Sequence, residues 1–194
     1  MTDTVSMSKG ESISLTKKAP GLTKVFAGAG WDVKKAGATM DLDLAAFMLD
    51  ANGKLSGKGY FVYFGNKASA CGSVASQGDN LTGAGDGDDE VVDVNLATVP
   101  TGIQEILFVA SIYQAAQKGQ SLKDLDNAFI RIVNAENQQE LAKYDITQIA
   151  ATGASFVLGK LVREGADWNF VAIGESDAGE LGALATRFGL AVAA

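Results

Sequence analysis

The chain has 194 residues, of which 47% are hydrophobic; this suits a single domain with a packed core and argues against a disordered protein. It contains no histidine and one cysteine, Cys71, so a Ser-His-Asp triad, a histidine-ligated metal centre and an intramolecular disulfide are excluded. The net charge of −7 is uneven, because six acidic residues and no basic residue lie between positions 79 and 93, while acids and bases nearly balance elsewhere.

The same features bound the location and the partners. No apolar run approaches the roughly 18 residues that a membrane span needs, and residues 1–11 are polar, unlike a signal peptide. We therefore expect a cytoplasmic protein without direct membrane insertion. A concentrated acidic segment also repels nucleic acid, so no nucleic-acid partner is expected.

Short apolar segments separated by turn residues recur along the chain, which is typical of a β-sandwich or barrel. Residues 60–64 are apolar at every position, which predicts a central strand covered on both faces. We expect a mainly β fold, a β-sandwich with one or two short peripheral helices, forming one domain over residues 1–194. The predicted strands are 13–15, 24–31, 40–49, 60–64, 91–96, 105–113, 128–133, 140–146, 155–163 and 169–173.

Acidic residues mark the start of the third predicted strand. Asp41 and Asp43 are two positions apart, so they share a face, while Phe47 and Leu49 farther along that face are expected in the core. Asp32 follows the preceding glycine-rich strand. This arrangement predicts that Asp41 and Asp43 share a metal site with the acidic segment; the alternative is a solvent-exposed strand end.

The acidic segment itself, residues 79–90, reads DNLTGAGDGDDE. Calcium takes six to eight oxygen ligands at about 2.3–2.6 Å in flexible geometry. Glycines at 83, 85 and 87 allow the backbone to curl tightly enough to supply them. The spacing therefore predicts a calcium loop, and the alternative is a solvated acidic loop without an ion.

The twelve-residue length of this loop does not make it an EF-hand. Leu81 and Gly83 stand where ligands belong, and Ala84 replaces the turn glycine. Nor is it a phosphate-binding loop, because it has no lysine and its charge repels phosphate.

Two helices are expected after the loop. A helical turn is predicted at 114–118, and a second helix is predicted to begin with a capping box of Asp177 and Glu180 and to end at Gly189. Between these strands and helices, Arg131 is expected to pair with Asp126 or Glu140. The apolar face of the second helix repeats at helical spacing through Leu181, Leu184, Ala185 and Phe188.

Seven short motifs distributed over almost the whole chain carry a resemblance. They are SKG at 8–10, LTKKAPGL at 15–22, GWD at 30–32, DLD at 41–43, GDNLTG at 78–83, GDGDDE at 85–90 and NAFIR at 127–131. Together they resemble the TerD family of tellurite-resistance and general stress proteins.

The resemblance implies a calcium-binding β-sandwich that works with other stress-response proteins of the ter type, including a membrane protein. Two calcium ions are expected, since their four positive charges would offset most of the acidic segment. Gly65, Cys71 and Ala84 replace residues that offer more oxygens in the family. The predicted metal ligands are Asp32, Asp41, Asp43, Asn66, Asp79, Asn80, Leu81, Gly83, Asp86, Gly87, Asp88, Asp89 and Glu90.

The leading functional hypothesis is a calcium-dependent interaction module for the stress response, without enzymatic activity. One alternative is a calcium-dependent membrane-surface binder, for which Leu81 is the only apolar residue evident beside the loop. Another is a metal-dependent hydrolase, for which no general base beyond the ligands is evident. Cys71 is interpreted as a small loop residue, with direct tellurite capture as the alternative.

Overall fold

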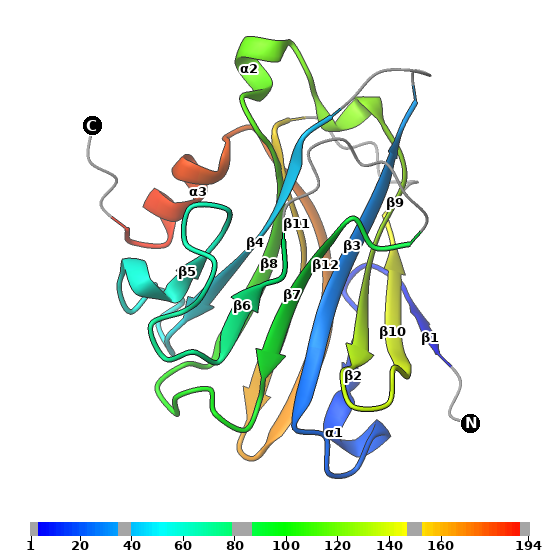
Figure 1. The fold of residues 1–194 in the computed structure, drawn as a ribbon, viewed down its shortest axis with the longest axis vertical. Coiled ribbons are helices and arrows are strands. Elements are labelled where there is room, and N and C mark those ends of the chain that lie inside the picture. The colour runs from blue at the N-terminus through cyan, green and yellow to red at the C-terminus, as the bar shows by residue number, and fades with distance from the viewer. Residues whose placement is uncertain (1–3, 35–39, 79–86, 147–152, 191–194) are drawn as a thin grey trace.

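The computed structural model describes residues 4–34, 40–78, 87–146 and 153–190, which form two facing six-stranded sheets (Figure 1). All neighbouring strands are antiparallel except β1 and β10. The first sheet has the order β1 (Val5–Met7), β10 (Glu140–Asp145), β9 (Leu125–Asn134), β3 (Lys24–Val33), β7 (Glu90–Asn95) and β6 (Val74–Ser76). The second has the order β2 (Ser12–Ser14), β12 (Asp167–Asp177), β11 (Ser155–Glu164), β8 (Glu105–Ile112), β4 (Leu42–Leu49) and β5 (Phe61–Val62).

This architecture confirms the prediction of a mainly β sandwich. The helices are short: α1 (Leu15–Lys18) and α2 (Ala115–Lys118) lie at opposite ends of the sandwich, and α3 (Leu181–Arg187) lies near β5 (Figure 1). Two single 3₁₀ turns, η1 (Lys58–Tyr60) and η2 (Leu122–Asp124), complete the described elements. None of the helices in the described ranges is long and apolar enough to cross a membrane.

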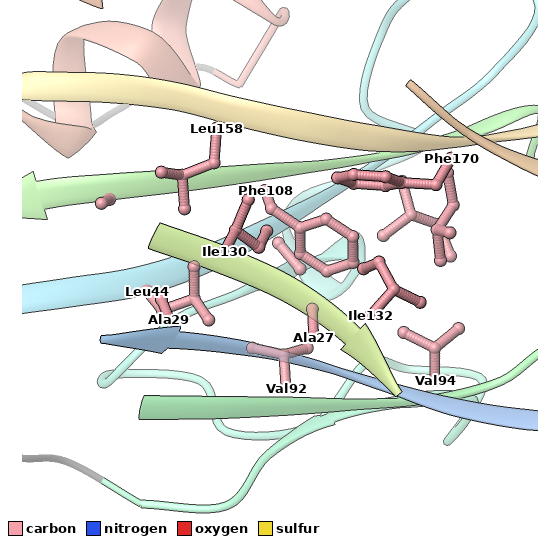
Figure 2. Packing of buried hydrophobic residues seen from close by; sticks show 14 of the residues in the cluster. Ala27, Ala29, Leu44, Val92, Val94, Phe108, Ile130, Ile132, Leu158 and Phe170 are labelled. Carbon is pink, nitrogen blue, oxygen red and sulfur yellow. The ribbon is translucent and has the colours of Figure 1, made fainter. Parts of the chain in front are cut away.

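The main core fills the space between the two sheets. Ala27, Ala29, Val92 and Val94 of the first sheet face Phe108 and other apolar side chains of the second (Figure 2). Strands alternate their side chains between faces, so the neighbours of these residues point outward. On β3 the outward positions next to Ala27 and Ala29 are therefore Gly28 and Gly30.

A second apolar cluster lies on the outer face of the second sheet, under α3. Phe47, Leu49 and Phe61 pack there with Leu184 and Ala185 of the helix. Phe47 and Leu49 were expected in a core, but that core is this outer cluster, not the space between the sheets. On β4 it is Leu42, Leu44, Ala46 and Met48 that face the first sheet.

Several boundaries differ from the sequence prediction. The segment 60–64 is not a central strand: β5 has two residues and lies at the edge of the second sheet. It is nevertheless covered on both faces, since Val62 faces the main core and Phe61 faces the cluster under α3. Residue 15 is not in a strand either, because the Ser14 hydroxyl accepts a hydrogen bond from Lys17 N and caps α1.

The start of α3 also differs from the prediction. Asp177 is the last residue of β12, paired with Ser155, and its carboxylate accepts a hydrogen bond from Gly179 N. No capping box forms there, because Glu180 is itself the N-cap residue and makes no side-chain cap bond. The predicted C-terminal end is confirmed: Gly189 has φ +91°, and Leu190 N donates to Ala185 O in a Schellman-type arrangement.

Candidate metal centre

The described end of the acidic segment lies on the outer face of the first sheet. Gly28 and Gly30 leave this face of β3 without side chains, and the segment fills the space. A Cβ on Gly30 would lie 2.4 Å from the carbonyl oxygen of Gly87, and one on Gly28 would lie 2.3 Å from the carboxylate carbon of Asp88. A side chain at Gly30 would therefore displace the backbone of Gly87, and one at Gly28 would displace the Asp88 carboxylate.

Asp89 is attached to β3 by two hydrogen bonds. Its backbone N donates to Ala29 O at 2.8 Å, and its Oδ2 accepts from Trp31 N at 2.8 Å. Both bonds extend the pairing of β3 with β7 beyond Glu90, where the ladder ends. The bond from Trp31 N fixes the direction of the Asp89 side chain.

The carboxylate of Asp89 lies among other acids. Burial raises its pKa above the usual range, and repulsion from Asp32 and Asp88 raises it further, against the lowering effect of the bond from Trp31 N. Repulsion of this kind is relieved when a cation binds between the carboxylates. Asp32 is itself oriented by Asn127, whose Nδ2 donates to Asp32 Oδ2 at 2.9 Å.

A hollow of about 310 Å³ opens beside these acids. Asn127 reaches it from a left-handed backbone conformation, with φ +48°. Most polar side chains that line the hollow carry oxygen atoms, and Lys143 is the basic residue among the lining residues. It is lined by Trp31, Asp32, Gly87, Asp89, Asn127, Phe129, Lys143 and Asp145.

Asp88 has a different partner. Arg131 Nε donates to Asp88 Oδ1 at 2.7 Å and Arg131 Nη2 donates to Oδ2 at 2.8 Å, while Nη1 reaches Glu140 Oε2 at 3.2 Å. The hydrogen bonds that Arg131 donates to Asp88 are the main cause of the raised pKa of Arg131. Glu140 was a predicted partner of Arg131 and is confirmed; Asp126 is not bonded to it, and Asp88 was not foreseen.

Glu90 links the two sheets. Its side chain lies on the inward face of β7 with Val92 and Val94, and it is only 5% exposed. Its Oε2 accepts a hydrogen bond from Leu44 N at 2.5 Å, where β5 is too short to pair with β4. The end of the acidic segment is thus adjacent to the start of β4.

The other predicted ligands fall in several places. Asp43 is buried on β4, paired in register with Ser111, and Asp41 forms an ion pair with Lys118 at 3.7 Å. Asn66 donates from Nδ2 to Phe61 O and lines a separate hollow near α3. Asp79, Asn80, Leu81, Gly83 and Asp86 lie outside the described residues.

The donor chemistry of the site fits calcium. Asp32, Asp89 and Asn127 present hard oxygen atoms at one hollow, which is what calcium requires. Across the described ranges, no three acidic or cysteine side chains gather closely enough to hold an ion by themselves. A complete shell would therefore need further oxygens.

Sequence reasoning missed Asn127, Lys143 and Asp145. Asn127 belongs to the NAFIR motif, and Lys143 and Asp145 follow the two-residue alternation of an outward strand face. That alternation places them on a face but gives no indication that β10 pairs with β9, which in turn pairs with β3. The register of the sheet supplies that information.

A two-sheet β-sandwich, with Gly87 and Asp88 of the acidic segment packed onto the outer face of one sheet, defines the class of protein. A family model described as the TerD domain matches residues 3–188, so this chain belongs to the TerD family of tellurium-resistance and general stress proteins.

Similar proteins support this membership. The chain is 42% identical to "Tellurium resistance protein TerD" of Serratia marcescens over 96% of its length and 97% of the relative. It is 44% identical to "General stress protein 16U" of Bacillus subtilis (strain 168), over 97% and 99% of the two chains.

Solved structures show the same fold. A protein of unknown function, SAV2460, superposes with a TM-score of 0.69 at 23% identity, over 85% of this chain and 95% of that one. A homologue of telluride resistance protein (TerD), SCO6318 from Streptomyces coelicolor A3(2), superposes with a TM-score of 0.67 at 18% identity, over 85% and 96%.

Proposed function

We propose that this protein binds calcium on the outer face of the first sheet through Asp32, Asp89 and oxygens of the acidic segment. The observation that carries the proposal is the position of Asp89: its carboxylate is fixed by Trp31 N and repelled by two neighbouring acids beside an open hollow. A bound cation would turn that repulsion into attraction. The site would prefer calcium to magnesium, because magnesium demands a small, rigid octahedral shell.

The functional consequence would be a metal-dependent interaction module in the stress response. Relatives are named for tellurium resistance and general stress, and the partners would be other proteins of the ter type, including a membrane protein. The protein would act in the cytoplasm and without catalysis. Binding would order the acidic segment and the adjoining face, and so change which partner fits there.

An exposed aromatic pair supports the interaction part of this proposal. Phe64 is 42% and Tyr113 40% exposed, and their rings meet edge to face at 5.6 Å. The backbone N of Tyr113 donates to the carbonyl of Asp41, a predicted ligand.

Calorimetric titration with calcium, and thermal melting with calcium, magnesium or chelator, test the metal proposal. Calcium at one hundred times its Kd should stabilise the fold by about 2.7 kcal/mol, and magnesium should do much less. Asp89→Asn should lose most of this effect. Glu164→Gln, in the hairpin between β11 and β12, is the matched control and should retain it.

Equal stabilisation by the two ions would contradict the proposed preference, and no heat and no shift with calcium would refute the metal function. For the interaction part, a purified ter-type partner should bind in calcium and dissociate in chelator. Equal binding of the partner in calcium and in chelator would show that the interaction does not depend on the metal.

A further inference from the structure

We propose that Asp88 is a positioning residue for the calcium site and not a calcium ligand. Its ion pair with Arg131 anchors the acidic segment to the first sheet, so that the next residue, Asp89, points at the hollow. This inference rests on the proposed calcium function and reassigns one residue that the sequence placed among the ligands.

The geometry of the ion pair favours an anchoring role for Asp88. Both oxygens of Asp88 accept hydrogen bonds from the Arg131 guanidinium, and the Asp88 side chain is only 8% exposed. Two parallel charge-assisted bonds are stronger and more directional than a single contact. Each oxygen keeps a second lone pair, but a metal bound there would lie next to the positive charge of Arg131, which repels it.

Gly28 provides the space that the Asp88 carboxylate occupies. A Cβ on Gly28 would lie 2.3–2.5 Å from three atoms of the Asp88 carboxylate group, so this group rests directly on the backbone of β3. Gly28 is opposite Arg131 in the register of β3 and β9. Gly28 and Arg131 therefore together form the position that the Asp88 carboxylate occupies, called the seat below.

The position of Asp88 also sets the direction of the next residue, Asp89. Gly87 passes over Gly30 with φ +103°, and Asp89 is bonded to Ala29 O and Trp31 N. Asp88 thus lies between two attachment points of a short segment. Its anchoring holds the adjacent Asp89 carboxylate toward Asp32.

Arg131 is held on its far side as well. Glu140 accepts a hydrogen bond from Arg131 Nη1, so the guanidinium is held by acidic side chains on two sides. Residues that orient ligands in this way typically change metal affinity by about 10–100-fold when they are replaced.

The test is the calcium affinity of a set of variants, measured by calorimetry, with melting in chelator as the readout of the metal-free fold. Arg131→Met distinguishes the two roles by sign. If Asp88 is an anchor, losing Arg131 should weaken calcium binding by about tenfold or more. If Asp88 is a ligand, losing Arg131 frees it and removes a repelling cation, so binding should become tighter.

Three further variants isolate the geometry. Arg131→Lys keeps the charge but not the bidentate fork, Gly28→Ala fills the seat without changing any charge, and Asp88→Asn weakens the pair from the other side. Each should weaken calcium binding to a similar extent. The double variant Asp88→Asn with Arg131→Met should bind no more weakly than the weaker single variant, because both remove one interaction.

Lys160→Met is the matched control, since Lys160 forms a comparable ion pair with Glu105 between β11 and β8. It should leave calcium affinity unchanged. Tighter or unchanged binding in both Arg131→Met and Arg131→Lys would overturn the positioning role, as would additive losses in the double variant. Failure of the unaltered protein to bind calcium would instead refute the calcium function on which this inference rests.

Discussion

The outer faces of the two sheets have opposite chemistry, although both sheets contribute equally to the core between them. On the first sheet, Gly28 and Gly30 leave the surface open, and a charged segment lies directly on the backbone. On the second sheet, Phe47 and Phe61 stand on the surface, and α3 covers them. The size of the outward side chains thus decides what covers a strand in this molecule. A polar segment covers the strand whose outward residues are glycines, and a helix covers the strands whose outward side chains are large and apolar.

The covered face also continues as a row of aromatic rings. Phe47 stacks on Phe61 at 4.4 Å, Phe61 stacks on Tyr63 at 4.4 Å, and Phe64 lies 5.1 Å from Tyr63. The row is buried at Phe47 and exposed at Phe64. The outer face of the second sheet therefore stabilises the fold at its buried end and presents exposed apolar rings at the other end. The outer face of the first sheet carries charged groups instead.

The strongest test of this contrast is Phe47→Ala. Removing the ring leaves a cavity under α3, so we expect a loss of about 3–5 kcal/mol in the free energy of unfolding. Denaturant titration in chelator measures it. If the faces are independent, the calcium affinity of the folded variant should be unchanged; a parallel loss of affinity would show that the two faces are coupled.

Two glycine-to-alanine substitutions compare the packing at Gly30 on the first sheet with the packing at Gly182 in α3, which covers the second sheet. Gly30→Ala would place a Cβ against Gly87 O and should cost about 1–3 kcal/mol. Gly182→Ala in α3 meets nothing within 4 Å and should be neutral or stabilising by up to about 1 kcal/mol. Thermal melting of the pair in chelator decides the matter, and equal effects would contradict the close packing at Gly30.

The smallest expected effect is on pH dependence. Burial raises the pKa of Asp93, which lies on β7 and accepts a hydrogen bond from Gln77. A carboxyl with a higher pKa in the folded state binds its proton more tightly there, so its contribution to stability is present below the unfolded pKa. That contribution is lost as pH rises through the folded pKa.

Asp93→Asn should remove this loss. The stability of the variant relative to the unaltered protein should therefore increase as pH rises from below the unfolded pKa to neutrality. Denaturant titrations across that range measure the difference. A constant difference between the two proteins would show that the pKa of Asp93 is the same in the folded and unfolded states.

The comparison also shows what local patterns can predict. Long apolar strands such as β8 and β11 were located from sequence because burial imposes a run of apolar residues. The three-residue strands β1 and β6 were missed, since three residues carry too little pattern. The helical spacing of the apolar residues predicts α3, but the predicted start is wrong because Asp177 belongs to β12.

The candidate site also has one part that the sequence predicts and one part that only the arrangement of the strands shows. Clustering of acids and glycines in one segment was visible in the sequence. The pairing of Asp88 with Arg131 was not, because these residues are 43 positions apart and meet only through the register of β3 with β9. The hollow formed by Asp32, Asn127 and Asp145 depends on the same lateral order of strands.

The hydrogen bond between Trp31 and Asp89 also gives the molecule an intrinsic optical reporter. The indole of Trp31 is buried in the core, yet its backbone N contacts the carboxylate proposed to bind the ion. The other tryptophan, Trp168, lies on the second sheet against the Arg163 guanidinium. Fluorescence from Trp31 therefore reports events at the candidate metal centre from inside the core, and in a Trp168→Phe background it does so without a second emitter.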